Sequence, residues 1–258
     1  MQIQEIESLI QQFQYLSKGR VDFRKYAYYA ITHHSTAIEG STLTENQVID
    51  LLEYGKTVPE KPFSHHLMAY DHYRALEYVV NQADSQRSQV NAHIAIDLLR
   101  DIAAHVMRGS GGPVNTVLGT YDTSKGDLRL SSVRAGNRSF PDAKKVPDLL
   151  KNFCESTNAQ IHSAQTVEQK LRTSFQAHFD LVSIHPFGDG NGRTSRLLMN
   201  FIQTLFGLPI SVVFVSDRFA YIEALEQARR EEYMAPFYDF MFEQYGKFLV
   251  LEIRELKK

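Results

Sequence analysis

Apolar side chains recur three or four residues apart along most of this chain, which is the spacing of a helix with one buried face. Glycines, prolines and polar residues of the kind that end helices separate these stretches. Thr44-Glu45-Asn46-Gln47 has the form of a capping box, which predicts that a helix begins there. The pattern predicts an all-α fold, with helices over residues 3–16, 20–39, 44–54, 64–83, 90–107, 146–153, 167–184, 193–206, 217–230 and 236–256.

An insertion over about residues 108–145 departs from the helical pattern. It concentrates glycines and carries two prolines, so a helix is not expected there. Apolar and polar side chains alternate over residues 128–132, and a Gly136-Asn137 turn lies between Val133 and Phe140. These features predict a small β-hairpin. Insertions of this length in compact domains are often functional.

Residues 185–196 gather the groups that a phosphate-transfer site needs. Glycines in the segment free backbone N–H groups to point at a phosphate, and a helix that begins at Gly192 would add its positive end. Arg193 and Arg196 stand one helical turn apart and can both bind phosphate oxygens. Asp189 is a hard oxygen ligand suited to Mg²⁺, and the imidazole of His185 can accept a proton from an attacking hydroxyl. The segment reads His185-Pro186-Phe187-Gly188-Asp189-Gly190-Asn191-Gly192-Arg193-Thr194-Ser195-Arg196.

This segment resembles the complete active-site signature of the Fic domain (filamentation induced by cyclic AMP). The resemblance implies a Fic-type helical bundle with a small β-hairpin flap near the active site, and transfer of AMP from ATP to a protein hydroxyl. It also implies that His185 is the general base and that Asp189 holds Mg²⁺. Gly190, Asn191 and Gly192 would form an anion hole, while Arg193 and Arg196 would bind the outer phosphates of ATP.

A second segment is similar to the inhibitory motif of Fic proteins. It reads Ser35-Thr36-Ala37-Ile38-Glu39-Gly40 and lies near the end of the helix predicted over residues 20–39. Ser35 and Glu39 are one turn apart on one helix face. A carboxylate in the last turn meets the negative end of the helix dipole, a cost that a cation elsewhere could offset. The resemblance implies that this cation is Arg196, so that Glu39 would keep ATP from binding productively.

The resemblance also divides the chain and names further contacts. Residues 1–85 would form an N-terminal helical region with the inhibitory motif, and residues 86–258 the Fic core with its flap and active-site loop. A target protein would dock along the flap by strand addition. Pro141-Asp142 stands where family members often have two prolines, which leaves the target open. Tyr221 is a candidate for adenine binding, although a tyrosine on such a helix face is more often a core residue.

Composition narrows the function classes. Hydrophobic residues make up 43% and charged residues 22% of the chain, as in soluble globular proteins, and no apolar run approaches a membrane span. The formal net charge of −2 gives no reason to expect a nucleic-acid partner. Cys154 is the single cysteine, which excludes an internal disulfide and fits a reducing cytoplasm. The His33-His34 and His65-His66 pairs do not predict zinc, because adjacent side chains diverge on a helix.

Three alternatives stay open at this point. Some Fic proteins with a glutamate in the inhibitory helix also remove AMP, which would make Glu39 a residue that places water. A related branch transfers phosphate instead, but its loop departs from the Gly190-Asn191-Gly192-Arg193 sequence. The chain could also be a nucleotide-sensing interaction module without transfer activity. The family habit of dimerising adds the expectation of a homodimer.

Overall fold

The computed structural model describes residues 1–87, 93–135 and 138–258. Helices dominate, and two short antiparallel hairpins supply the strands of the described chain, so the prediction of an all-α fold with a small hairpin is confirmed. By their packing, the described residues divide into two compact units, residues 62–206 and residues 1–61 with 207–258. The division of the chain at residue 85 by motif stays a prediction.

The unit of residues 62–206 is built around one buried helix, α8 (Asn191–Leu205). The helices α4 (Phe63–Arg87), α5 (Ile96–Val106) and α7 (Val167–Ile184) pack against it, and α6 (Val146–Ser163) packs on α7. Every residue of α8 except Gly192 is buried, including two arginines. A helix enclosed on all sides is held rigidly by its neighbours, so the residues at its start are fixed in place.

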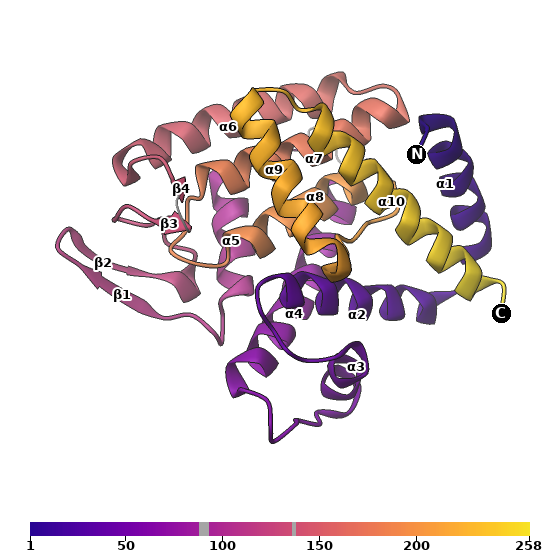
Figure 1. The fold of residues 1–258 in the computed structure, drawn as a ribbon, viewed down its shortest axis with the longest axis horizontal. Coiled ribbons are helices and arrows are strands. Elements are labelled where there is room, and N and C mark those ends of the chain that lie inside the picture. The colour runs from indigo at the N-terminus through magenta and orange to yellow at the C-terminus, as the bar shows by residue number, and fades with distance from the viewer. Residues whose placement is uncertain (88–92, 136–137) are drawn as a thin grey trace. The chain divides into compact units, whose positions relative to one another are not determined.

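The insertion of this unit forms two hairpins (Figure 1). The first pairs β1 (Pro113–Thr116) with β2 (Gly119–Asp122), and a 3₁₀ turn, η1 (Thr123–Lys125), then packs on α5. The second pairs β3 (Arg134–Ala135) with β4 (Arg138–Ser139), and η2 (Ala143–Lys145) leads into α6. The hairpin predicted within residues 133–140 is therefore present, while its predicted Gly136-Asn137 turn lies outside the described residues.

Two sequence predictions need correction in this region, and one hairpin was missed. The hairpin over residues 113–122 was not predicted, because its strands are short and mostly exposed. Residues 128–132 are not a strand; Leu128 makes a single bridge to Phe187, and Arg129 is 1% exposed. In the helix expected over residues 90–107, residues 93–95 are not helical and α5 begins at Ile96, while residues 90–92 lie outside the described residues. The Asn158 side chain binds both the N–H and the carbonyl of Ile94, which holds that residue outside the helix.

The unit of residues 1–61 and 207–258 consists of two packed sets of helices. In one set, α1 (Ile3–Ser17) lies along α10 (Ala235–Leu256), and α10 also packs on α9 (Arg218–Glu231). In the other set, α2 (Val21–Ile38) packs on α3 (Glu45–Tyr54) and on the 3₁₀ turn η3 (Val215–Asp217). The capping box predicted at Thr44 is confirmed, with reciprocal bonds to Gln47. Within the described chain, no helix combines the length and the apolar character that a membrane crossing requires.

Candidate functional site

The backbone of His185 adopts a conformation that is rare for residues other than glycine. Helix α7 ends at Ile184, and His185 caps it with φ 54° and ψ 59°, while its N–H donates to the Leu181 carbonyl at 3.0 Å. A side chain in this left-handed region is strained, and it persists only where its surroundings fix it. Here the Nε of Arg129 donates to the His185 carbonyl at 2.7 Å. The histidine predicted to act as base therefore lies at a turn whose strained backbone is held in place by hydrogen bonds.

The imidazole of His185 is oriented by two contacts. Its Nδ1 lies 3.3 Å from the Val182 carbonyl, and because a carbonyl oxygen only accepts, Nδ1 carries the proton in the neutral ring. The ring also stacks on Phe140, with the two ring centres 3.7 Å apart and the planes inclined by 20°. This tautomer leaves the lone pair on Nε2, which is the form that a general base requires.

The loop between α7 and α8 is closed by Asn191. Its Oδ1 accepts from the Phe187 N–H at 3.0 Å and its Nδ2 donates to the Phe187 carbonyl at 2.9 Å. Both residues are buried. At Gly188 a Cβ atom would lie 2.7 Å from the ring of Tyr121, so the β1–β2 hairpin packs directly on the loop. The side chain of Asn191 thus shapes the loop from inside, while its backbone N–H stands at the start of α8.

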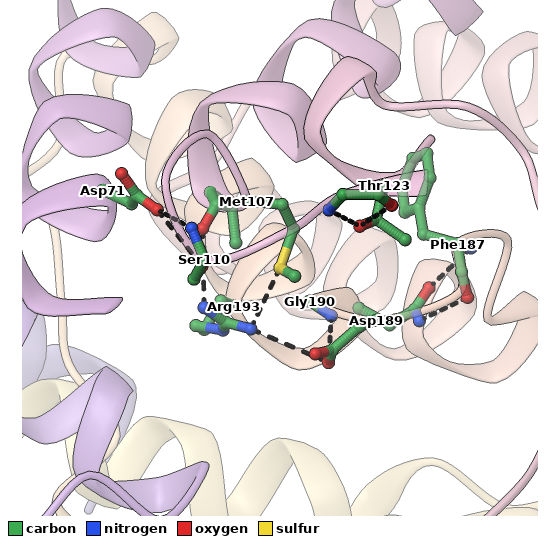
Figure 2. A network of polar contacts seen from close by, with 11 residues as sticks. Asp71, Met107, Ser110, Thr123, Phe187, Asp189, Gly190 and Arg193 are labelled. Carbon is green, nitrogen blue, oxygen red and sulfur yellow. Dashed lines mark hydrogen bonds and ion pairs between the residues drawn. The ribbon is translucent and has the colours of Figure 1, made fainter. Parts of the chain in front are cut away.

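The two arginines at the start of α8 are both buried. Arg193 is 3% exposed, and its guanidinium contacts the Met107 sulfur at 3.2 Å and the Asp189 carboxylate at 3.7 Å (Figure 2). Arg196 is 4% exposed. His72 of α4 is buried beside them; burial, then the charges of Arg196 and Arg193, hold its pKa well below the usual value. The imidazole of His72 beside the two arginines is therefore neutral. It adds no charge of its own, so the positive charge of the arginines stays available for an anionic ligand.

A buried carboxylate fixes the turn that presents Met107 to Arg193. Asp71 of α4 accepts from the N–H of Gly109 at 2.8 Å, the N–H of Ser110 at 3.0 Å and the Ser110 hydroxyl at 3.1 Å (Figure 2). Burial raises the pKa of Asp71, against the lowering effect of these bonds and of Arg193. Sequence reasoning missed Asp71, His72 and Met107, because they lie far along the chain from the loop and belong to no motif.

Asp189 is the exposed carboxylate of the loop. Its side chain is 69% exposed, and Oδ1 accepts from the Gly190 N–H at 2.6 Å. The described residues hold no cluster of three or more histidine, cysteine or acidic side chains that would bind a metal by themselves. Mg²⁺ commonly uses one or two carboxylates together with substrate phosphates and water. A single exposed carboxylate beside a phosphate site fits this manner of binding.

The predicted regulatory and adenine-binding residues belong to the unit of residues 1–61 and 207–258. Ser35 is buried, and Glu39 caps the end of α2, where its N–H donates to the Thr36 carbonyl at 3.1 Å. Arg218 of the same unit lies at this helix end, and its Nε donates to the Ile38 carbonyl at 2.7 Å. Tyr221 is 2% exposed and is buried in that unit's core. Its assignment to adenine, like the regulatory role of Glu39, stays a prediction.

The loop and the start of α8 place an imidazole at one end and two arginines at the other of a helix N-terminus, an arrangement that suits an anion such as phosphate. Residues 93–203 match the sequence model of the Fic/DOC family. The chain therefore carries a Fic domain over these residues.

One curated protein and two solved structures are similar to this chain. The chain is 31% identical over 201 residues to the protein adenylyltransferase fic-1 of Caenorhabditis elegans, an alignment that covers 78% of this chain and 36% of the relative. The chain thus spans about a third of the length of that curated relative. The structure of a Fic domain containing signaling protein from Bacteroides thetaiotaomicron is similar, with a TM-score of 0.82, 20% identity and coverage of 98% and 97% of the two chains. Residues 134–508 of Fic-1 from C. elegans give a TM-score of 0.78 at 23% identity, with coverage of 99% and 72%.

Proposed function

We propose that this chain is a protein adenylyltransferase, which transfers AMP from ATP to a serine, threonine or tyrosine hydroxyl of a target protein. The observation that carries the proposal is the fixed His185, whose Nε2 lone pair stands at one end of a loop that ends in two buried arginines. A base and a phosphate site on one rigid loop are what an in-line attack on phosphorus needs. The 31% identity to a protein named as an adenylyltransferase supports the same reaction.

The proposed reaction assigns each part of the loop a task. The target hydroxyl oxygen attacks the α-phosphorus of ATP while its proton passes to Nε2 of His185. The bond between the α-phosphorus and the bridging oxygen breaks, and pyrophosphate leaves with the electron pair. N–H groups at residues 190–192, with Arg193 and Arg196, hold the leaving charge. Mg²⁺, bound through Asp189 and the phosphates, would supply further charge neutralisation.

We further propose that Glu39 restrains this activity by pairing with Arg196. The support is the inhibitory motif over Ser35 to Gly40, placed at the end of α2, together with an arginine that a γ-phosphate would need. Removing the carboxylate should release Arg196 for ATP. We expect the target protein to dock at β3–β4, whose strands are two residues long. An extended segment of the target would pair with this hairpin as an added strand. A homodimer and a cytoplasmic location remain predictions from the sequence.

The test is self-labelling and lysate labelling with ATP carrying label at the α-phosphate. Glu39→Gly is expected to label itself and lysate proteins strongly, and Glu39→Gly with His185→Ala is expected to label nothing while still binding ATP. Binding of ATP by Glu39→Gly without any labelling would contradict the transferase and favour a nucleotide-sensing module. Release of AMP from a modified target, lost in Glu39→Gln, would favour the reverse reaction.

A further inference from the structure

Arg129 is an arginine enclosed almost completely by the protein. Its side chain is 1% exposed, and each of its three donor groups binds a backbone carbonyl. Nε donates to His185 at 2.7 Å, Nη1 to Ser131 at 2.9 Å and Nη2 to Pro141 at 2.6 Å. Its backbone N–H donates to the Pro186 carbonyl at 3.0 Å. Burying a guanidinium is costly unless its donors are satisfied, so this arrangement ties three distant carbonyls firmly together.

The carbonyls that Arg129 binds belong to two functional segments. Ser131 lies before strand β3 and Pro141 lies after strand β4, so the guanidinium closes the base of that hairpin. The Phe140 N–H, which donates to the Val133 carbonyl at 3.3 Å, adds a bond across the same base. The third carbonyl is that of His185, whose left-handed backbone has to be held. One side chain therefore joins the base of the flap to the proposed general base.

Stacked side chains also connect the end of the β3–β4 hairpin with His185. Phe140, next to Pro141, covers one face of the His185 imidazole at 3.7 Å. The guanidinium carbon of Arg138 lies 4.5 Å from the centre of the Phe140 ring. Since the imidazole already covers one face of Phe140, the guanidinium lies over the other. The direction of the imidazole thus depends on where the end of the hairpin is held, and Arg129 holds it.

We propose that Arg129 is a positioning residue that couples the β3–β4 flap to His185. It touches no substrate; it keeps the His185 carbonyl turned inward and keeps Phe140 against the imidazole, so that Nε2 points in one direction. The role rests on the proposed function, because it is stated for a general base. A displacement of about 1 Å at a reacting group can cost roughly a hundredfold in rate, so a loosened imidazole should be visible in kcat.

The experiment uses Glu39→Gly as the active parent and compares Arg129→Met and Arg129→Lys with Arg100→Gln. Arg100 is a matched control, because its guanidinium also binds a carbonyl of the insertion, that of Gly126 at 3.2 Å, without contacting His185. Arg129→Met should lower kcat roughly ten- to hundredfold and leave KM for ATP within about twofold. Arg129→Lys, which keeps the charge and one bond, should fall between, and Arg100→Gln should match the parent.

A second readout does not depend on turnover. The imidazole protons of His185, identified by their loss in His185→Ala, lie over the Phe140 ring and should show an upfield ring-current shift in proton NMR spectra. Phe140→Leu abolishes this shift; Arg129→Met should abolish it too, Arg129→Lys should reduce it, and Arg100→Gln should retain it. An unmoved resonance and an unchanged kcat in a folded Arg129→Met or Arg129→Lys protein would overturn the proposal. If the parent itself transfers no AMP, the proposed function fails, and the resonance still decides whether Arg129 positions the ring.

Discussion

Asn191→Ala is the substitution that most directly probes how the loop is held. In the structure the amide of Asn191 makes two hydrogen bonds with the backbone of Phe187, one as acceptor at 3.0 Å and one as donor at 2.9 Å. Asn191 is 3% and Phe187 2% exposed, so water does not replace the lost partner. Alanine leaves one buried N–H and one buried carbonyl unsatisfied.

The expected loss of stability follows from these two groups. Each buried group left without a partner costs about 1–3 kcal/mol, so the pair should lower the free energy of unfolding by about 3 kcal/mol. For a chain of this size about 1 kcal/mol shifts Tm by roughly 2–4 °C, which gives a fall of about 6–12 °C. The affinity for nucleotide should also fall in Asn191→Ala, because the N–H groups at the start of α8 lose their fixed direction.

Thermal unfolding followed by circular dichroism measures the shift, with Asn191→Asp as the matched variant. Aspartate keeps the acceptor for the Phe187 N–H and loses the donor, so its Tm should lie between those of Asn191→Ala and the wild type. A Tm for Asn191→Ala within about 1 °C of the wild type would refute the reasoning, since the two bonds would then contribute nothing measurable.

Three further predictions concern other parts of the chain. Gly188→Ala should cost about 1–3 kcal/mol of overpacking against Tyr121, measured by chemical denaturation. Arg218→Gln, which removes the bond to the Ile38 carbonyl at the end of α2, the proposed inhibitory helix, should raise basal AMP transfer about two- to fivefold, the equivalent of about 0.4–1 kcal/mol for a helix-end charge. Glu252→Gln should stabilise the protein at pH 8 and not at pH 4. Burial first, then neighbouring carboxylates, raises the pKa of Glu252 from 4.5 to about 7. The stabilising effect of protonation is thus complete below pH 4.5 and is lost as the pH rises through 7, up to about 3 kcal/mol.

Each of these has a control within the chain. Gly112→Ala, where a Cβ meets no atom within 4 Å, should leave stability unchanged, and equal effects at both glycines would exclude the Tyr121 contact as the cause. Arg229→Gln removes an arginine that pairs with Glu226 on the same helix α9 and should not change basal transfer. A gain for Glu252→Gln that is as large at pH 4 as at pH 8 would contradict the titration.

The sequence predicted the helices well because each depends on its own side-chain pattern and end signals. Residues 167–184 were predicted as a helix, and α7 has these bounds. The helix predicted over residues 90–107 was wrong at residues 93–95, because Asn158, more than sixty residues away, binds the backbone of Ile94. Local periodicity carries no information about such a partner.

The site shows the same division between local and distant information. Residues 185–196 form one contiguous signature, so His185, Asp189 and both arginines could be proposed as site residues from the sequence, and they stay predictions. Arg129 could not, because an arginine between apolar residues usually faces solvent, and only the fold brings three carbonyls to its guanidinium. Phe140 is likewise ordinary until it is found on the face of His185.

The central claim is that the loop transfers AMP from ATP to protein. The most direct measurement incubates Glu39→Gly with a protein target or with itself, using ATP labelled in parallel at the α-phosphate and at the γ-phosphate. Label from the α position should become covalently attached, label from the γ position should not, and His185→Ala in the same background should attach neither. Attachment of γ label would identify phosphate transfer and contradict the account.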